Sequence, residues 1–289
     1  MAYQNPAFYF YHALRDSQDI VTTPGSTQAD QTPLYDSRIG ALFQWDAAIG
    51  TVAVPSNKSV TFQLSGTGTY NQLNDSSFAA DPAAAAMDTC IIAGHNIGGM
   101  EITAFTQYDA VDLYSPNTPI DVATNGQIVI LPFTPGRTIP SNTERLSFTI
   151  RPNDDTYAAV IPEISELWFT QERELTRGPE PNWNHPYRTT QKRFESVGGV
   201  SSTWMTGPAR KTYRLTWRHL FGADRQIFLD MKEQTDDFSQ PFFFRPPDDA
   251  YPTILVELDR DAGWTQDFMD PLISGTSDQI TLPLIEVLG

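Results

Sequence analysis

The 289-residue sequence has one cysteine, Cys90, and lacks long apolar runs. A single thiol excludes an intrachain disulfide framework and any metal cluster made of several cysteines. No apolar run approaches the roughly 20 residues that a membrane-spanning helix needs, so we expect no membrane insertion. The first residues, MAYQNPAFYFYHALRDS, lack a basic leader followed by an apolar block. This predicts no secretory signal and synthesis in a cytoplasm.

Helical periodicity is scarce, whereas apolar and polar residues alternate over many short segments, which predicts a mainly β protein. One convincing helix is expected over Ala223–Gln234, with Ile227, Phe228 and Met231 on its apolar stripe and Asp224 placed as its cap. Cys90 lies in an apolar strand and is expected to be an inert, buried thiol. The alternating apolar sets are Val60, Phe62 and Leu64; Met100, Ile102 and Ala104; Leu146, Phe148 and Ile150; Tyr213, Leu215 and Trp217; Ile254, Val256 and Leu258; and Ile280, Leu282 and Leu284.

The length fits two domains of ordinary size, each able to bury its own core. The alternating pattern gives way to charged, proline-rich sequence over Phe169–Pro181, so the boundary is expected there. We therefore predict a β-sandwich domain over residues 1–170 and a smaller β domain over residues 171–289, with the helix near 223–234.

Few residues are arranged for chemistry. The four histidines are scattered, no phosphate-binding glycine loop is followed by the required partner, and no nucleophile elbow occurs. Adjacent acids in loops are usually turn formers, and neighbours on a strand face opposite ways, so we expect no enzyme, metal or cofactor. A glycan-degrading β-sandwich enzyme stays open because it needs only two carboxylates in one groove, and loop acids could also bind calcium. The acid pairs are Asp154–Asp155, Asp236–Asp237, Asp248–Asp249 and Glu163 with Glu166.

Charge is unevenly distributed. The formal net charge of −16 argues against a nucleic-acid partner. The segment Arg173–Arg218 nevertheless has nine basic residues against three acidic ones, a net of +6. Such a basic belt is either a solvated strand face or a surface that meets an acidic face of a neighbouring copy, where complementary charge would fix the register.

Two runs of aromatic residues are expected to be buried against other parts of the protein or a partner. Phe242–Phe244 lie between prolines, and their rings are either satisfied within the C-terminal domain or covered by a partner subunit. The run Phe8–Tyr11 near the N-terminus is expected to dock on folded structure. With the basic belt, these patterns define the candidate assembly residues, which are Arg193, Arg210, Arg214, Arg218, Phe242, Phe243, Phe244 and Arg245.

Several segments together resemble a known family. Leu34–Asp36, Ala41–Trp45 and Thr89–Asn96 (TCIIAGHN) resemble the galactose-binding-like, discoidin-type β-sandwich found in tail proteins of tailed bacteriophages. Ala158–Thr170 is similar to the last sandwich strand of these proteins. The C-terminal half, through KTYRLTWRHL, the helix and QPFFFRPPDD, is similar to the C-terminal β domain of phage distal-tail and tail-tip proteins.

The resemblance implies a virion structural protein of the phage tail, at the tail tip or baseplate, that acts by binding. It implies self-assembly into a symmetric trimer or hexamer ring that connects the tail tube to fibres or other tail proteins. The sugar-binding loops of lectin-like relatives are not matched, so no glycan ligand carries over from the fold. A carbohydrate-binding adhesin stays open as an alternative: it would recognise a host-surface glycan with loop aromatics such as Trp45, Tyr70 or Tyr114.

Overall fold

A computed structural model of the chain describes residues 4–11, 19–22, 34, 41–63, 87–107, 118–134, 145–180, 187–188, 191–195, 201–205, 209–220, 222–248, 251–259, 265–269 and 277–287. It divides into two compact units. We call residues 11–172 the two-sheet unit, and residues 1–10 with 173–288 the split unit, because two separate pieces of the chain build it. The mainly β class predicted from alternation is confirmed.

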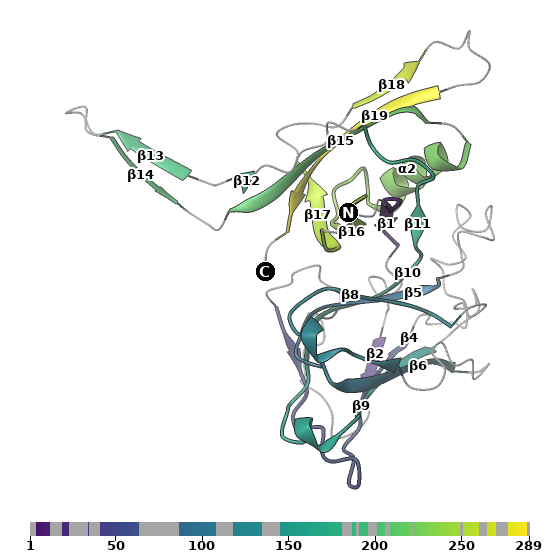
Figure 1. The fold of residues 1–289 in the computed structure, drawn as a ribbon, viewed down its shortest axis with the longest axis vertical. Helices are drawn as coiled ribbons and strands as arrows, with labels where there is room; N and C mark the ends of the chain where they lie inside the picture. The colour runs from purple at the N-terminus through teal and green to yellow at the C-terminus, as the bar shows by residue number, and fades with distance from the viewer. Residues whose placement is uncertain are drawn as a thin grey trace. The chain divides into compact units, whose positions relative to one another are not determined.

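The two-sheet unit consists of two antiparallel sheets, drawn as two layers in Figure 1. One has the strand order β3-β10-β5-β8 and the other β2-β4-β9-β6-β7. The rings of Phe62 and Phe169, one from each sheet, lie 6.5 Å apart, so the core lies between the layers. The elements are β2 (Asp19–Thr22), β3 (Phe43–Gln44), β4 (Lys58–Gln63), β5 (Thr89–His95), β6 (Met100–Gln107), β7 (Thr118–Pro119), η2 (Val122–Thr124), β8 (Val129–Pro132), β9 (Arg145–Pro152), η3 (Asp155–Tyr157) and β10 (Glu163–Thr170).

Alternation predicted the inward faces of β4 and β9 correctly where the structure describes them, and Leu64 lies outside the described residues. Leu146, Phe148 and Ile150 on β9 are fully buried, as are Val60 and Phe62 on β4. β5 and β10 differ, because both of their faces are buried; β5 is mostly apolar, whereas β10 also buries Ser165, Glu166 and Thr170. Cys90, on β5, is buried as expected.

The split unit is built on one antiparallel sheet with the order β11-β1-β16-β17-β19-β15-β12, and β18 pairs with β19 beside this path. On β15, Tyr213, Leu215 and Trp217 are buried, while Arg214 and Arg218 are exposed, as alternation predicts. The elements are β1 (Ala7–Tyr9), β11 (Arg173–Glu174), β12 (Tyr187–Arg188), β13 (Gln191–Glu195), β14 (Ser201–Met205), β15 (Arg210–Leu220), α2 (Gly222–Gln234), β16 (Phe242–Arg245), β17 (Ile254–Leu258), β18 (Thr265–Met269) and β19 (Ser277–Glu286).

The predicted helix is present as α2, and its stripe of Ile227, Phe228 and Met231 is buried. The cap assigned to Asp224 is wrong. Asp224 lies in the first turn, and its carboxylate accepts hydrogen bonds from the backbone N–H and the hydroxyl of Thr176, at 3.0 and 2.7 Å. The side chain therefore fixes the chain that follows β11 to the helix.

The first ten residues need a correction. The expected division placed them with residues 1–170, but β1 pairs with β11 and β16 of the split unit. The aromatic run Phe8–Tyr11 is buried, which satisfies the expectation that it docks. Its docking place could not be anticipated, because both partner strands are more than 160 residues away along the chain.

Candidate functional site

The basic residues between Arg173 and Arg218 do not form one open belt. Three of them pair with acids of their own unit. The side chains of Arg173 and its partner are only 13% and 16% exposed, so this ion pair lies largely inside the split unit and is not offered to a neighbour. The other two pairs are more exposed, and such pairs contribute little to stability and can exchange partners readily. The three pairs are Arg173–Asp230 (2.6 Å), Arg210–Glu257 (3.4 Å) and Arg218–Glu180 (2.9 Å).

Arg214 is the exposed cation on the outward face of β15 that pairs with no acid within the described residues. Its strand neighbour Pro283 on β19 offers no charge. Arg193 lies on β13 opposite Thr203, and its side chain is outside the described part of the structure. Of the candidate cations, Arg214 is thus the one that the described structure leaves open to a partner.

The phenylalanine run is not an exposed surface. Phe242, Phe243 and Phe244 are each 0% exposed. β16 lies between β1 and β17, and Phe8 on β1 packs against two of the rings. The alternative in which the unit's own core satisfies all three rings is therefore correct, and these residues leave the candidate surface.

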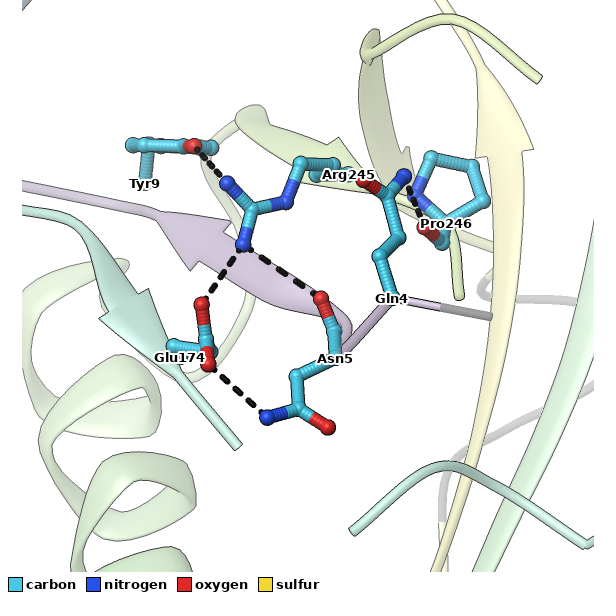
Figure 2. Close-up of polar contacts among 6 residues, drawn as sticks. All are labelled: Gln4, Asn5, Tyr9, Glu174, Arg245 and Pro246. Atoms are coloured by element: carbon cyan, nitrogen blue, oxygen red, sulfur yellow. Dashed lines mark hydrogen bonds and ion pairs between the residues drawn. The ribbon is translucent and has the colours of Figure 1, made fainter. Parts of the chain in front are cut away.

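Arg245 is also engaged inside the unit, as Figure 2 shows. Its guanidinium donates to the hydroxyl of Tyr9, to the carbonyl of Asn5 and to the Glu174 carboxylate, at 3.4, 3.4 and 2.9 Å. Asn5 donates from its amide to the other oxygen of Glu174 at 2.8 Å. Arg245 therefore links β16, β1 and β11 instead of offering a free charge to a neighbour.

Strands β13 and β14 form a two-stranded ribbon that pairs with none of the other described strands. The register runs from Gln191 opposite Met205 to Glu195 opposite Ser201. Figure 1 shows the ribbon projecting beyond the end of β15. A two-stranded ribbon on its own is marginally stable in water.

The first of the acid pairs, Asp154–Asp155, is engaged in structural contacts. Asp154 caps η3 by accepting from the Thr156 N–H at 2.7 Å, and Asp155 accepts from the Val52 N–H at 2.8 Å. Asp236 and Asp237 have φ of 51° and 56° in the turn after α2. Asp248 is half-buried, and Asp249 lies outside the described residues.

Glu163 and Glu166 do not converge, because three residues apart on a strand places them on opposite faces. The Glu163 carboxylate contacts the Gln44 amide. Glu166 is 0% exposed and accepts from the Trp168 indole N–H at 2.8 Å. The sequence alone does not indicate that the Glu166 side chain is buried, because nothing in the local pattern of β10 distinguishes it from an exposed glutamate.

His95 is a second buried ionisable group. It is 5% exposed, and its Nδ1 accepts from the Ile97 N–H at 3.4 Å, while Nε2 has no hydrogen-bond partner within the described structure. Desolvation by burial lowers the pKa of His95 from 6.5 to about 4. The imidazole is therefore neutral near pH 7. His95 is the last residue of β5, within the segment Thr89–Asn96 that carries the sequence resemblance.

Of the aromatics proposed to stack on sugars, the structure describes Trp45, which is buried. Trp45 is 1% exposed and packs edge-on against Phe43 with ring centroids 4.7 Å apart. Tyr70 and Tyr114 lie outside the described residues. In the part of the chain that the structure describes, no three His, Cys, Asp or Glu side chains are placed to hold a metal ion. The described helices include none long and apolar enough to cross a membrane.

Comparison with known proteins identifies no family. No protein-family model matches the chain, and neither a curated protein nor a solved structure matches it. The functional argument therefore rests on the residues and the fold described above.

Proposed function

We propose that the protein is a structural component of a tailed-phage virion, at the tail tip or baseplate, where copies associate into a symmetric trimer or hexamer ring. In this proposal it acts by binding, and it connects the tail tube to fibres or other tail proteins. The two-sheet unit would be the galactose-binding-like sandwich. The assignment to a phage particle is supported by the sequence resemblance of both halves of the chain. The two layers of antiparallel strands agree with a sandwich.

The observation that carries self-association is the β13–β14 ribbon. It pairs with no other described strand, and a ribbon of this kind gains stability when a neighbour covers it. Its sequence contains Lys192 and Arg193 on adjacent positions, which face opposite sides of the strand. A chain of net charge −16 offers many acidic surfaces to such a ribbon, so the contact would be strengthened by charge.

The candidate contact surface is accordingly smaller than the sequence suggested. We place it on the ribbon, including Arg193, and on the outward face of β15, where Arg214 is exposed and the ion pairs of Arg210 and Arg218 lie at the surface. Phe242–Phe244 and Arg245 are not part of it, because they are buried in or bonded within the split unit.

Light scattering of the purified protein at low and high salt tests self-association. We expect a mass of three or six copies at low salt that falls as salt screens the charged contacts. Arg193→Glu and Arg214→Glu should each shift the equilibrium toward the monomer. Lys232→Glu on α2 makes the same charge change away from this surface and should leave the mass unchanged. A monomer at every salt concentration, or equal effects of all three variants, would contradict the proposed surface.

The place in the particle needs its own experiment. An antibody against the chain, applied to intact phage particles and seen by immunogold electron microscopy, should label one end of the tail. Label on the capsid, or none on intact or opened particles, would refute the tail assignment even if the protein forms a ring.

A further inference from the structure

The N-terminal strand β1 occupies a slot between β11, which ends the split unit's sheet on one side, and β16. Ala7 lies opposite Glu174 of β11 on one side and opposite Arg245 of β16 on the other. Without β1, both neighbours would present unpaired backbone groups toward one gap. A gap of this kind binds an extended peptide by adding it as a strand.

The slot buries the side chains of this mainly aromatic segment. Residues Ala7–Tyr11 are all at most 3% exposed. The Phe8 ring lies within a cluster of four other aromatic rings of the split unit. The centroid distances are 5.1 Å to Phe244, 5.7 Å to Phe228, 6.0 Å to Trp217 and 6.0 Å to Phe242. Phe8 is therefore the anchor of the inserted strand.

Polar contacts fix the register. Gln4 bonds the carbonyls of Pro246 and Pro247 through its amide and its backbone N–H, at 3.0 and 2.9 Å. Asn5 is held between Glu174 and Arg245 (Figure 2). A segment shifted by one residue would lose these contacts and turn its aromatic side chains to the other face.

We propose that this slot also accepts the N-terminal segment of a second copy, so that exchange of β1 links neighbouring copies. Among the described strands of this sheet, β1 alone comes before the two-sheet unit in the chain, so no short turn ties it to β11 or β16. Every copy carries the same segment, and all of the contacts above are the same whichever copy donates it. In a ring, each copy can donate to the next, and closure leaves no slot empty.

This proposal rests on the self-association proposed above. The contacts of β1 are the same in its own slot and in a neighbour's slot. The equilibrium between the two therefore depends on the effective concentration of a copy's own β1 compared with the local concentration of β1 from neighbouring copies. Dilute protein should keep β1 in its own slot. Assembly, which holds copies beside one another, should favour exchange.

Single-cysteine variants can report which copy donates the strand. Ala7 and Glu174 are direct partners across β1 and β11, and directly opposite residues in an antiparallel pair are about 4.5–5.5 Å apart between Cα atoms, which suits a disulfide. The native Cys90 is buried and should not compete. Ala7→Cys and Glu174→Cys chains are mixed, assembled at low salt and oxidised, and mass spectrometry then identifies the linked peptides. The double variant is treated in parallel.

Exchange predicts a 7–174 disulfide between chains in the mixture, and a covalent ladder from the double variant on a non-reducing gel. Each single variant alone is the control and cannot form the 7–174 linkage. If light scattering shows an oligomer while the double variant forms only intrachain disulfides, exchange is refuted and ring assembly stands. If the protein stays monomeric with intrachain disulfides, both proposals fail.

A measurement on the unaltered chain covers the case in which the cysteine variants fail to fold. A fluorescent synthetic peptide of residues 1–11 is incubated at high concentration with the assembled protein, then separated by gel filtration. The peptide should co-migrate with the protein, and a peptide with Phe8→Ser should not. Absence of uptake, or equal uptake of both peptides, would refute a specific exchangeable slot.

Discussion

Lowering the pH should destabilise the two-sheet unit through His95. The folded-state pKa of His95 is about 4, below the value of 6.5 expected when the chain is unfolded, because burial disfavours the charged imidazole. Well above pH 7 both states are neutral at this residue, so it contributes no pH dependence there. Between pH 6.5 and about 4, the unfolded state binds a proton that the folded state does not. The free energy of unfolding therefore falls as the pH drops through this window.

The magnitude follows from the shift. One pKa unit corresponds to about 1.4 kcal/mol, so a decrease from pH 7 to pH 5 costs about 2 kcal/mol through His95. Below pH 4 the folded state is protonated too, and the loss levels off at about 3 kcal/mol. This is a large fraction of the roughly 5–15 kcal/mol that stabilises an ordinary domain.

Unfolding in urea, monitored by hydrogen–deuterium exchange of peptides from β5 and β10, would measure the free energy of unfolding of the two-sheet unit separately from that of the split unit. His95→Asn keeps an oxygen that can accept from the Ile97 N–H but does not titrate, so the variant should lose about 2 kcal/mol less than the natural chain between pH 7 and pH 5. His219→Asn is the matched control: His219 belongs to the split unit and has a φ of 58°, which asparagine tolerates, so the pH dependence of the two-sheet unit should stay that of the natural chain. Identical pH dependence of His95→Asn and the natural chain would refute the argument.

Three substitutions test the packing. Phe8→Ala should destabilise the split unit by about 3–5 kcal/mol in urea unfolding while the exchange rates of the two-sheet unit stay unchanged; a loss below about 1 kcal/mol would contradict its role as anchor. Gly99→Ala should cost about 3 kcal/mol or more, because its φ is +78° and the added Cβ would lie 2.0 Å from the Tyr157 ring, whereas Gly126→Ala, with a φ of +74° and open space, should cost only about 1–2 kcal/mol. Arg245→Met should cost about 1–3 kcal/mol in the split unit, measured by the same unfolding assay, and an unchanged stability would show that its bonds contribute nothing net.

The sequence was sufficient for features that depend on local periodicity. The strand faces around Phe148 and Leu215 and the buried stripe of α2 follow from side-chain spacing alone. The helix cap was misjudged because Asp224 finds a partner in Thr176, 48 residues away, and no local pattern reports such a contact.

The candidate site was less predictable for the same reason. A count of basic residues cannot show that Arg173 meets Asp230 or that Arg245 meets Glu174. The burial of Phe242–Phe244 likewise depends on β1, whose pairing spans almost the whole chain. The local composition identified groups that need partners, but only the long-range pairing shows which of them are already satisfied.

The pairing of β1 with β11 means that the two-sheet unit lies, along the chain, between two neighbouring strands of the split unit. The chain leaves the split unit after Phe10 and returns at Arg173, and Phe8 and Arg173 are direct partners in neighbouring antiparallel strands. Continuing that register places Phe10 opposite Gln171, so a short Asn-Gly turn could join them as a hairpin. The remaining sheet would keep every strand, so we expect the split unit to fold without the two-sheet unit. A chain with residues 11–170 replaced by that turn should give the dispersed amide NMR spectrum of a folded protein.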